Sequence, residues 1–309
     1  MTDIQELIPD VYVIPGGTNV GVIRVKSESG CGLYLIDSGG SENDARKIEK
    51  ILDEHFTDRH LRAVINTHSH ADHTGGNAYF AEKTKCEIWM PYLEKGSVEN
   101  TLLQPSLAWG GFPLPELRTS YYVPAHCEAT RIIRAEECVE LSDGKKIRFI
   151  ALPGHYFEML GVMCTIPDGK CAFFAGDAVF GKKVIAKFSI PFMLDIFSFL
   201  DTLEKLRSVR ADRYVPSHGE AVTRIDETVE MNQIAVLQTI SCIMKILKKK
   251  PHTAEELLTE VANVNGISMK LAQYVLIGST LRSFLTCLYE KGRITYEIAD
   301  NKMLWKAVD

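Results

Sequence analysis

The chain has 309 residues, of which 46% are hydrophobic and 24% charged, and its formal net charge is −5. This apolar content excludes a disordered chain, and the acidic balance gives no general attraction to nucleic acid. The sequence contains no run of about 18 apolar residues, so we expect no membrane-spanning helix. The N-terminus lacks the features of a secretory signal. The eight cysteines form no C-x-x-C pair, so we expect reduced thiols in a cytoplasmic protein.

Short β-branched and aromatic runs open the chain and predict strands at residues 11–14, 20–25 and 33–36. A helix follows, because Ser41 can cap it and Ile48 and Leu52 share one apolar face. The pattern then predicts a strand at 61–66, a loop, a short helix around 78–81 and a strand at 86–90.

The stretch 91–130 interrupts this rhythm with four internal prolines and a group of aromatic residues that includes Tyr121 and Tyr122. Loops of this length are uncommon and often act as lids or contact surfaces. We therefore expect an irregular, lid-like insertion or a homodimer contact, with a flap packed on the body as the alternative.

Strands resume at 147–150, 161–166 and 171–174, followed by a helix at 197–206 and a strand at 213–216. The two halves of the first 222 residues therefore have a similar order of elements. Such an order favours two sheets packed face to face with helices outside them.

The remainder of the chain is predicted to be helical, with a connecting helix in 223–250 and a separate module in 251–309. A capping box at Thr253–Glu256 begins the module, helices are predicted at 268–277 and 279–289, and two alternating strands end it. This is the pattern of a winged helix. The module carries six basic and seven acidic residues, so we expect packing or dimerisation and not DNA binding.

Potential metal ligands are concentrated in the loop after the strand at 61–66, which reads Thr-His-Ser-His-Ala-Asp-His-Thr-Gly-Gly. Four of them fall within six residues: His68, His70, Asp72 and His73. Imidazole nitrogen and carboxylate oxygen suit zinc, and also iron or manganese. The two glycines let the backbone fold tightly behind the ligands.

Three further polar residues, His155, Asp177 and His218, each stand at the end of a predicted strand beside a small residue. Loops at strand ends commonly build sites over a rigid scaffold. Asp37 also ends a strand, before a Ser-Gly-Gly turn, so it is a candidate either for the site or for the turn.

In this order, Asp37, the H-x-H-x-D-H cluster, His155, Asp177 and His218 resemble the metallo-β-lactamase superfamily over residues 10–222. The resemblance implies an αββα sandwich in residues 1–222, with two divalent metal ions, most suitably zinc, at one edge. It implies that His68, His70 and His155 bind the first ion, that Asp72, His73 and His218 bind the second, and that Asp177 bridges them. Asp37 would orient the ligand loop from behind.

The ligand types narrow the subclass within this resemblance. Asp177 stands where β-lactam-hydrolysing members with a cysteine ligand would need cysteine, and His70 stands where diiron oxygen reductases usually have glutamate. Glyoxalase II, lactonases, some nucleases and persulfide dioxygenases have similar ligand sets. After His155 the chain places Tyr156 and Phe157 where relatives often have small residues, so these two, with Tyr121 and Tyr122, are the predicted pocket residues.

The leading hypothesis is a hydrolase of a small-molecule ester, thioester or lactone, in which a metal-bound hydroxide attacks the carbonyl carbon. Asp72 is the candidate catalytic residue, because it can orient the hydroxide and pass a proton to the leaving group. A metal-dependent phosphodiesterase or ribonuclease is the alternative. An enzyme with a single iron that acts as a dioxygenase, and a non-catalytic metabolite-binding protein, are the further alternatives.

Overall fold

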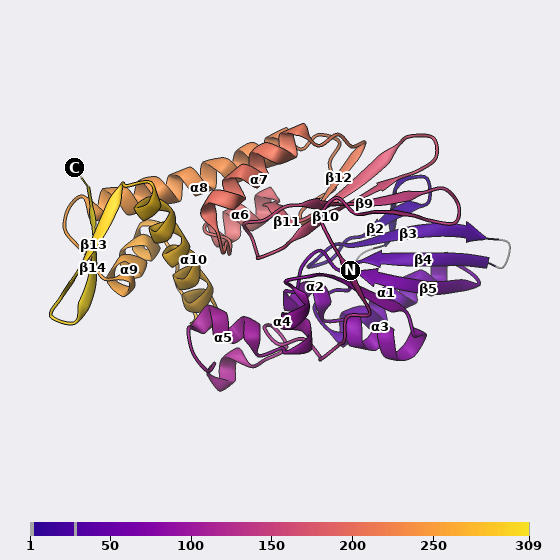
Figure 1. Cartoon of the computed structure of the whole chain (residues 1–309), viewed down its shortest axis with the longest axis horizontal. Coiled ribbons are helices and arrows are strands. Elements are labelled where there is room, and N and C mark those ends of the chain that lie inside the picture. The colour runs from indigo at the N-terminus through magenta and orange to yellow at the C-terminus, as the bar shows by residue number, and fades with distance from the viewer. Residues whose placement is uncertain (1–2, 28–29, 309) are drawn as a thin grey trace.

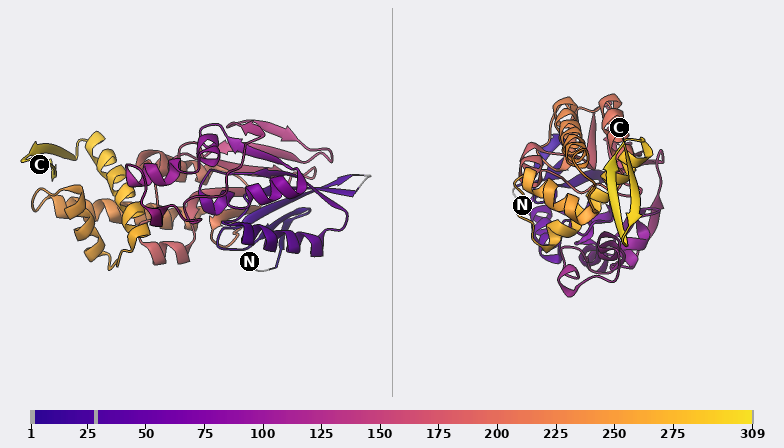
Figure 2. Two further views of the ribbon diagram at one scale, coloured as in Figure 1. Left: turned by 90° about the horizontal axis from the view of Figure 1, so that it is seen from below. Right: turned by 90° about the vertical axis from the view of Figure 1, so that its left-hand side faces the viewer.

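The computed structural model describes residues 3–27 and 30–308. Two β-sheets lie face to face between outer helices, and a small module occupies the opposite end of the elongated molecule (Figures 1 and 2). The predicted αββα sandwich with a C-terminal helical module is therefore confirmed. The domain boundaries at residues 222 and 250 stay a prediction.

The first sheet has its seven strands in chain order. They are β1 (Gln5–Ile8), β2 (Val11–Ile14), β3 (Val20–Ser27), β4 (Gly30–Ile36), β5 (Arg59–Ile65), β6 (Glu87–Pro91) and β7 (Arg131–Ile133). The first four pair antiparallel, and β4 to β7 pair parallel. The short edge strands β1 and β7 were not predicted. The equally short β2 is a continuous run of β-branched and aromatic residues, Val-Tyr-Val-Ile, and neither edge strand has such a run.

The second sheet has the order β12-β11-β10-β9-β8. Its strands are β8 (Cys138–Glu140), β9 (Lys146–Ala151), β10 (Leu160–Thr165), β11 (Cys171–Phe180) and β12 (Arg213–His218). Only β11 and β12 pair parallel. Both sheets thus direct the carboxyl ends of their parallel strands toward one edge of the sandwich, where loops can build a site.

Three apolar clusters fill the three interfaces between the four layers. Strand β11 shows how one strand serves two of them: Phe173 packs toward the outer helices, whereas Phe174 packs between the sheets. This alternation follows from the two-residue repeat of a strand. On the other side, Ile48 and Leu52 of α1 (Glu42–His55) cover the first sheet.

The remaining outer helices are α3 (Asn77–Thr84) on the first sheet, and α7 (Ile196–Ser208) and α8 (Asp226–Leu247) on the second. Ser41 caps α1 as predicted, since its side chain accepts a hydrogen bond from the Asp44 N–H. Two short helices complete the sandwich, α2 (Ala71–Thr74) inside the predicted ligand loop and α6 (Lys182–Phe188).

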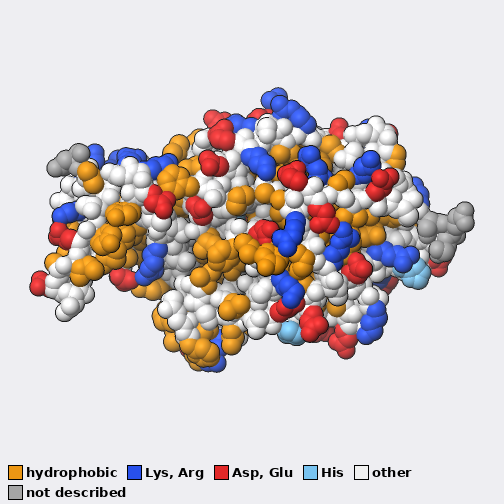
Figure 3. All heavy atoms as spheres, viewed as in Figure 1, with side chains coloured by type: hydrophobic (Ala, Val, Ile, Leu, Met, Phe, Trp, Pro, Cys, Tyr) orange, Lys and Arg blue, Asp and Glu red, His pale blue; other side chains and the backbone are white. Residues whose placement is uncertain are grey.

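The insertion at 91–130 is less irregular than predicted. It contains α4 (Lys95–Glu99), α5 (Leu103–Trp109) and the 3₁₀ turn η1 (Pro115–Leu117). Many of its large apolar side chains are exposed, including Leu103, Phe112 and Tyr121, and hydrophobic side chains gather around α5 on the face seen in Figure 3. These helices were not predicted, because each is too short for a helical repeat of apolar residues to be recognised.

The C-terminal module consists of α9 (Ala254–Val264), α10 (Leu271–Glu290) and the hairpin of β13 (Ile294–Ala299) and β14 (Lys302–Ala307). The prediction of two helices at 268–277 and 279–289 was wrong, because Gly278 continues the helix and lies buried against Leu258. Among the described residues, only α10 has the length and hydropathy of a membrane span, yet half of that window is buried in the protein. A core helix has the same property.

Candidate metal centre

The candidate ligands meet at one edge of the sandwich, because each follows or ends a strand there. Residues 66–73 follow β5, His155 follows β9, and His218 is the last residue of β12. One expectation needs correction: Asp177 lies within β11, which continues to Phe180. The fold nevertheless brings all seven predicted ligands into one cluster.

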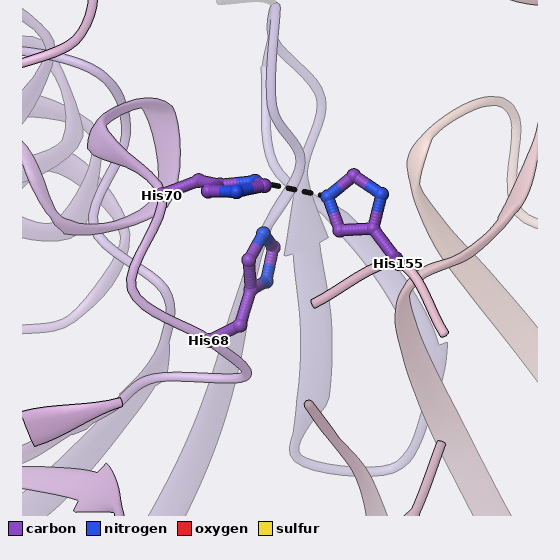
Figure 4. A group of neighbouring side chains, drawn as sticks. All are labelled: His68, His70 and His155. Atoms are coloured by element: carbon purple, nitrogen blue, oxygen red, sulfur yellow. Dashed lines mark hydrogen bonds between the residues drawn. The ribbon is translucent and has the colours of Figure 1, made fainter. Parts of the chain in front are cut away.

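The first group contains His68, His70 and His155, which all point toward one another in Figure 4. One donor atom from each lies within 4.8 Å of the others, and all three side chains are buried. Nε2 of His155 is only 2.9 Å from Nδ1 of His70. Three converging imidazoles are the donor set expected of a metal site.

The second group contains Asp72, His73 and His218, and Nε2 of His218 lies 3.1 Å from Oδ2 of Asp72. Asp177 lies between the two groups. Its Oδ2 is 3.3 Å from Nε2 of His155 and 3.4 Å from Nε2 of His218, and its Oδ1 is 3.4 Å from Nε2 of His73. This position suits a bridging carboxylate, although the individual ligand roles stay predictions.

Each of three histidines is held from behind by an oxygen. Nδ1 of His155 lies 2.9 Å from the Phe192 carbonyl, Nδ1 of His218 lies 2.7 Å from the Gly17 carbonyl, and Nδ1 of His73 lies 2.8 Å from Oδ2 of Asp37. These contacts orient Nε2 of each ring toward the cluster, as outer partners of metal ligands generally do.

Asp37 is buried and connects the first sheet to the ligand loop. Besides His73, it accepts hydrogen bonds from the N–H and the hydroxyl of Thr67, at 2.8 and 2.9 Å. Its backbone has a φ of +61°, a left-handed conformation that aspartate adopts more readily than most residues. The three side-chain contacts, and not the backbone, favour a role in holding the ligand loop over that of a simple turn residue.

Gly75 lets the ligand loop pack against the turn after β4. A Cβ atom at this position would lie 2.3 Å from the Gly40 carbonyl carbon, a distance that no side chain tolerates. The tight fold of the backbone that was predicted at Gly75 and Gly76 is therefore present, directly behind His73.

The histidines of the two groups differ in protonation when no metal is bound. Burial and neighbouring histidines lower the pKa of His68 and His70 well below the ordinary value, so both rings are neutral, which is the ligating form. Against the effect of burial, the carboxylates of Asp72, Asp177 and Asp37 raise the pKa of His73 to about 10. The carboxylates of Asp177 and Asp72 likewise raise the pKa of His218.

Three buried polar atoms of the cluster have no hydrogen-bond partner among the described residues: Nε2 of His68, Nε2 of His73 and Oδ1 of Asp177. Buried polar atoms without partners are rare in folded proteins. Because these three belong to the same cluster, the donor set fits divalent metal ions, for which nitrogen and carboxylate oxygen are the usual ligands.

Glu94 is a site residue that sequence reasoning missed. It is fully buried at the start of the insertion. Its Oε2 accepts hydrogen bonds from the N–H and the hydroxyl of Ser69, at 3.2 and 2.5 Å, and its Oε1 accepts one from the Glu158 N–H at 2.9 Å. It thereby joins the loop of His68 and His70 to the loop after His155. No local pattern marks this residue.

A cavity of about 610 Å³ opens above the cluster. His70, His155 and Asp177 lie at its base, and Tyr121, Tyr122 and Tyr156 are among its lining residues, as expected. Phe157 was also expected there, but it is absent from the described lining; its ring packs on Tyr156 with 5.0 Å between centroids, and the residue is 48% exposed. It turns outward because Tyr156 fills the inner position.

The family comparison agrees with this geometry. The model of the metallo-beta-lactamase superfamily matches residues 13–218, so the chain belongs to that superfamily. A beta-lactamase domain protein from Burkholderia ambifaria superposes with a TM-score of 0.75 at 17% identity, covering 99% of this chain and 94% of that protein. A family member from Thermus thermophilus gives 0.74 at 18% identity, with 98% and 100% coverage.

Relatives with functional names match at low sequence identity. An atrochrysone carboxyl ACP thioesterase from Emericella nidulans is 24% identical over all of this chain and 87% of its own length. A linear primary-alkylsulfatase from a Pseudomonas species is 24% identical, but the match covers 74% of this chain and 48% of that protein. Fold, site and relatives together define a hydrolase of the metallo-beta-lactamase fold.

Proposed function

We propose that the protein hydrolyses a carboxyl thioester, ester or lactone with the help of two divalent metal ions, most suitably zinc. The observation that carries this proposal is the convergence of buried imidazole and carboxylate atoms, three of them without a hydrogen bond among the described residues, beside a largely apolar cavity. Such a cavity accepts an organic acyl compound more readily than a phosphodiester chain.

The two groups of the cluster suggest how the ligands would be divided between the two ions. His68, His70 and His155 would hold one ion, Asp72, His73 and His218 the other, and Asp177 would contact both. Bound ions of this kind polarise a carbonyl oxygen and make a water molecule more acidic.

The chain's own contribution to proton movement falls to Asp72. Its side chain is 45% exposed and lines the cavity. Oδ2 accepts a hydrogen bond from the Thr18 hydroxyl at 3.0 Å and lies 3.1 Å from His218, so we assign Oδ1 to take the proton of the attacking water. As the new carbon–oxygen bond forms and the bond to the leaving group breaks, this proton passes to the leaving sulfur or oxygen.

The names of the relatives support a thioester in particular. The relative from Emericella nidulans is named as a thioesterase and matches the whole chain, including the segments outside the metal cluster. A lactamase-like protein from Pestalotiopsis fici, 23% identical, also covers the whole chain and 89% of its own length. That the chain acts in the cytoplasm on a small molecule remains part of the proposal.

The test is a panel of substrates offered to metal-loaded protein: an aryl thioester, an aryl ester, a lactone, bis-p-nitrophenyl phosphate and a single-stranded RNA. We expect turnover of a carboxyl substrate, and Asp72→Asn should lower kcat/KM at least about 100-fold, the order of a lost general base. Asp201→Asn, an exposed carboxylate of α7, is the matched control and should retain activity.

Other outcomes would replace the proposal. Cleavage of the phosphodiester or the RNA alone would establish the phosphodiesterase alternative. Oxygen uptake by the iron-loaded protein without hydrolysis would establish a dioxygenase. Metabolite binding without any turnover would indicate a binding protein.

A further inference from the structure

We infer that the cavity is an acyl chamber for a bulky apolar group, and that Leu276 of α10 and Leu107 of α5, which both line it, limit the size of that group. This inference rests on the proposed function, because it assigns the part of the substrate that lies away from the reacting carbonyl. It also gives the C-terminal module a role in substrate selection.

The chamber is built by segments that are distant in sequence. The insertion contributes Leu107, Ala108 and Tyr122, and α10 contributes Leu276 and Ile277. Figure 1 shows α5 beside the N-terminal end of α10, away from the two sheets. These side chains therefore form walls that the metallo-beta-lactamase core does not supply by itself.

The insertion and α10 pack against each other where they close the chamber, and we call this contact the roof. Leu117, Tyr122 and Val275 form a small buried cluster between the insertion and α10, and Leu276 packs against it. The hydroxyl of Tyr122 donates a hydrogen bond to the Ala272 carbonyl at 3.1 Å. A wall held by buried contacts and a hydrogen bond can discriminate by size, because it resists displacement by an oversized group.

The part of the cavity that α5 and α10 contribute is mostly apolar. Its lining contains Leu107, Ala108, Leu276 and Ile277, with the polar Gln104 and Gln273 beside them, whereas the candidate metal ligands line another part. A substrate would therefore place its carbonyl at the cluster and its apolar group between α5 and α10. Apolar area removed from water in this way favours binding by about 0.8 kcal/mol per methylene group, close to fourfold in affinity.

The kinetic test compares acetyl and octanoyl thioesters of N-acetylcysteamine. We expect kcat/KM to favour the octanoyl substrate by on the order of 100-fold, which corresponds to burial of about three of its six additional methylene groups. Leu276→Trp should reduce this preference at least tenfold by filling the chamber. Leu107→Trp, in α5, should act in the same direction. Tyr274→Trp is the matched control, since Tyr274 lies on α10, is 41% exposed and is not part of the described lining; it should retain the preference.

A binding measurement separates this inference from the proposed hydrolysis. The S-octyl and S-ethyl thioethers of N-acetylcysteamine lack the thioester carbonyl and cannot be hydrolysed there. By titration calorimetry, the octyl compound should bind at least tenfold more tightly to the wild type, and Leu276→Trp should abolish this difference. If the difference exists but no thioester, ester or lactone of the panel is hydrolysed, the chamber stands and the proposed function fails. Equal binding of both thioethers, or an octanoyl preference unchanged by Leu276→Trp, would overturn the chamber.

Discussion

At the scale of single residues, the site depends on side chains that hold the ligands as much as on the ligands. Asp37 holds His73 and Thr67, and Glu94 holds Ser69. Both carboxylates are almost completely buried. Because an unpaired carboxylate is costly to bury, the hydrogen bonds of both residues matter for stability, and substitution of either should be felt.

Glu94 predicts a pH effect on stability. Burial raises its pKa to about 7, although its hydrogen bonds act in the opposite direction. Between an unfolded pKa near 4.5 and this folded value, the folded protein binds more protons, so stability falls as pH rises. In metal-free protein, the free energy of unfolding of the wild type relative to Glu94→Gln should therefore fall by on the order of 3 kcal/mol from pH 4.5 to 7.

Urea denaturation in the presence of a chelator measures this difference. Glu116→Gln, at an exposed residue of the 3₁₀ turn, is the control and should show no comparable trend. A difference between wild type and Glu94→Gln that does not change with pH would contradict the assignment of a buried, protonated Glu94.

His73 and His218 predict that metal binding releases protons. Neighbouring carboxylates raise the pKa of both rings in the metal-free protein, yet a ligating nitrogen must give up its proton. At about pH 7.5 we expect on the order of two protons released per protein. Calorimetric titration with Zn²⁺ in two buffers of different ionisation enthalpy measures this number. The distant variant His55→Asn should release as many; zinc binding without any release would contradict the protonation state assigned to the cluster.

At the scale of elements, the position of a glycine decides what it does. Gly75 lies at the end of α2 against the Gly40 backbone, whereas Gly278 lies inside α10, where a Cβ atom would lie 3.4 Å from Leu258. The first glycine is required for a close approach of two backbones. The second is tolerated within a helix that other contacts stabilise.

Substitution of both glycines by alanine tests this difference. Gly75→Ala should lower the free energy of unfolding by about 1–3 kcal/mol, as overpacking does, and should reduce bound zinc measured by mass spectrometry. Gly278→Ala should be neutral or stabilise by up to about 1 kcal/mol through helix propensity, with unchanged zinc. A Gly75→Ala protein with full stability and zinc content would show that the loop has room that the structure does not contain.

The difference between local patterns and contacts between distant residues explains which features the sequence could predict. The cluster of His68, His70, Asp72 and His73 is local, so its spacing alone indicated a metal site, and the main strands followed from alternating patterns. Glu94 could not be found, because its partners Ser69 and Glu158 lie 25 and 64 residues away. Likewise, the break expected at Gly278 is absent because a tertiary contact overrides local propensity.

At the scale of the whole molecule, the C-terminal module is continuous with the catalytic sandwich. Phe284 and Leu288 of α10 belong to the same apolar cluster as Phe199 of α7. Thr280 and Ser283 of α10 also hydrogen-bond Met193 and Leu194, next to Phe192, whose carbonyl contacts His155. The module is thus connected to His155, a candidate metal ligand, through one short segment of chain.

The contact between the insertion and α10 gives a prediction at this scale. Tyr122→Phe removes the hydrogen bond to the Ala272 carbonyl and should lower the free energy of unfolding by about 1 kcal/mol. Amide hydrogen exchange should rise in α5 and the following segment, while β5 and β11 remain unchanged. Tyr92→Phe, at an exposed tyrosine of the same insertion, is the control. Equal exchange in wild type and Tyr122→Phe would show that packing alone holds the roof.

The roof formed by α5 and α10 has a consequence for how such a protein can diversify. The candidate ligands lie in or after strands of the two sheets, between positions 68 and 218. Leu107 and Leu276, which line the cavity, lie in two helices with no candidate ligand among their described residues. Mutations in these helices can therefore alter which molecule is accepted without disturbing the chemistry. A lineage that keeps the cluster constant and varies α5 and α10 would acquire new substrates in small, individually viable steps.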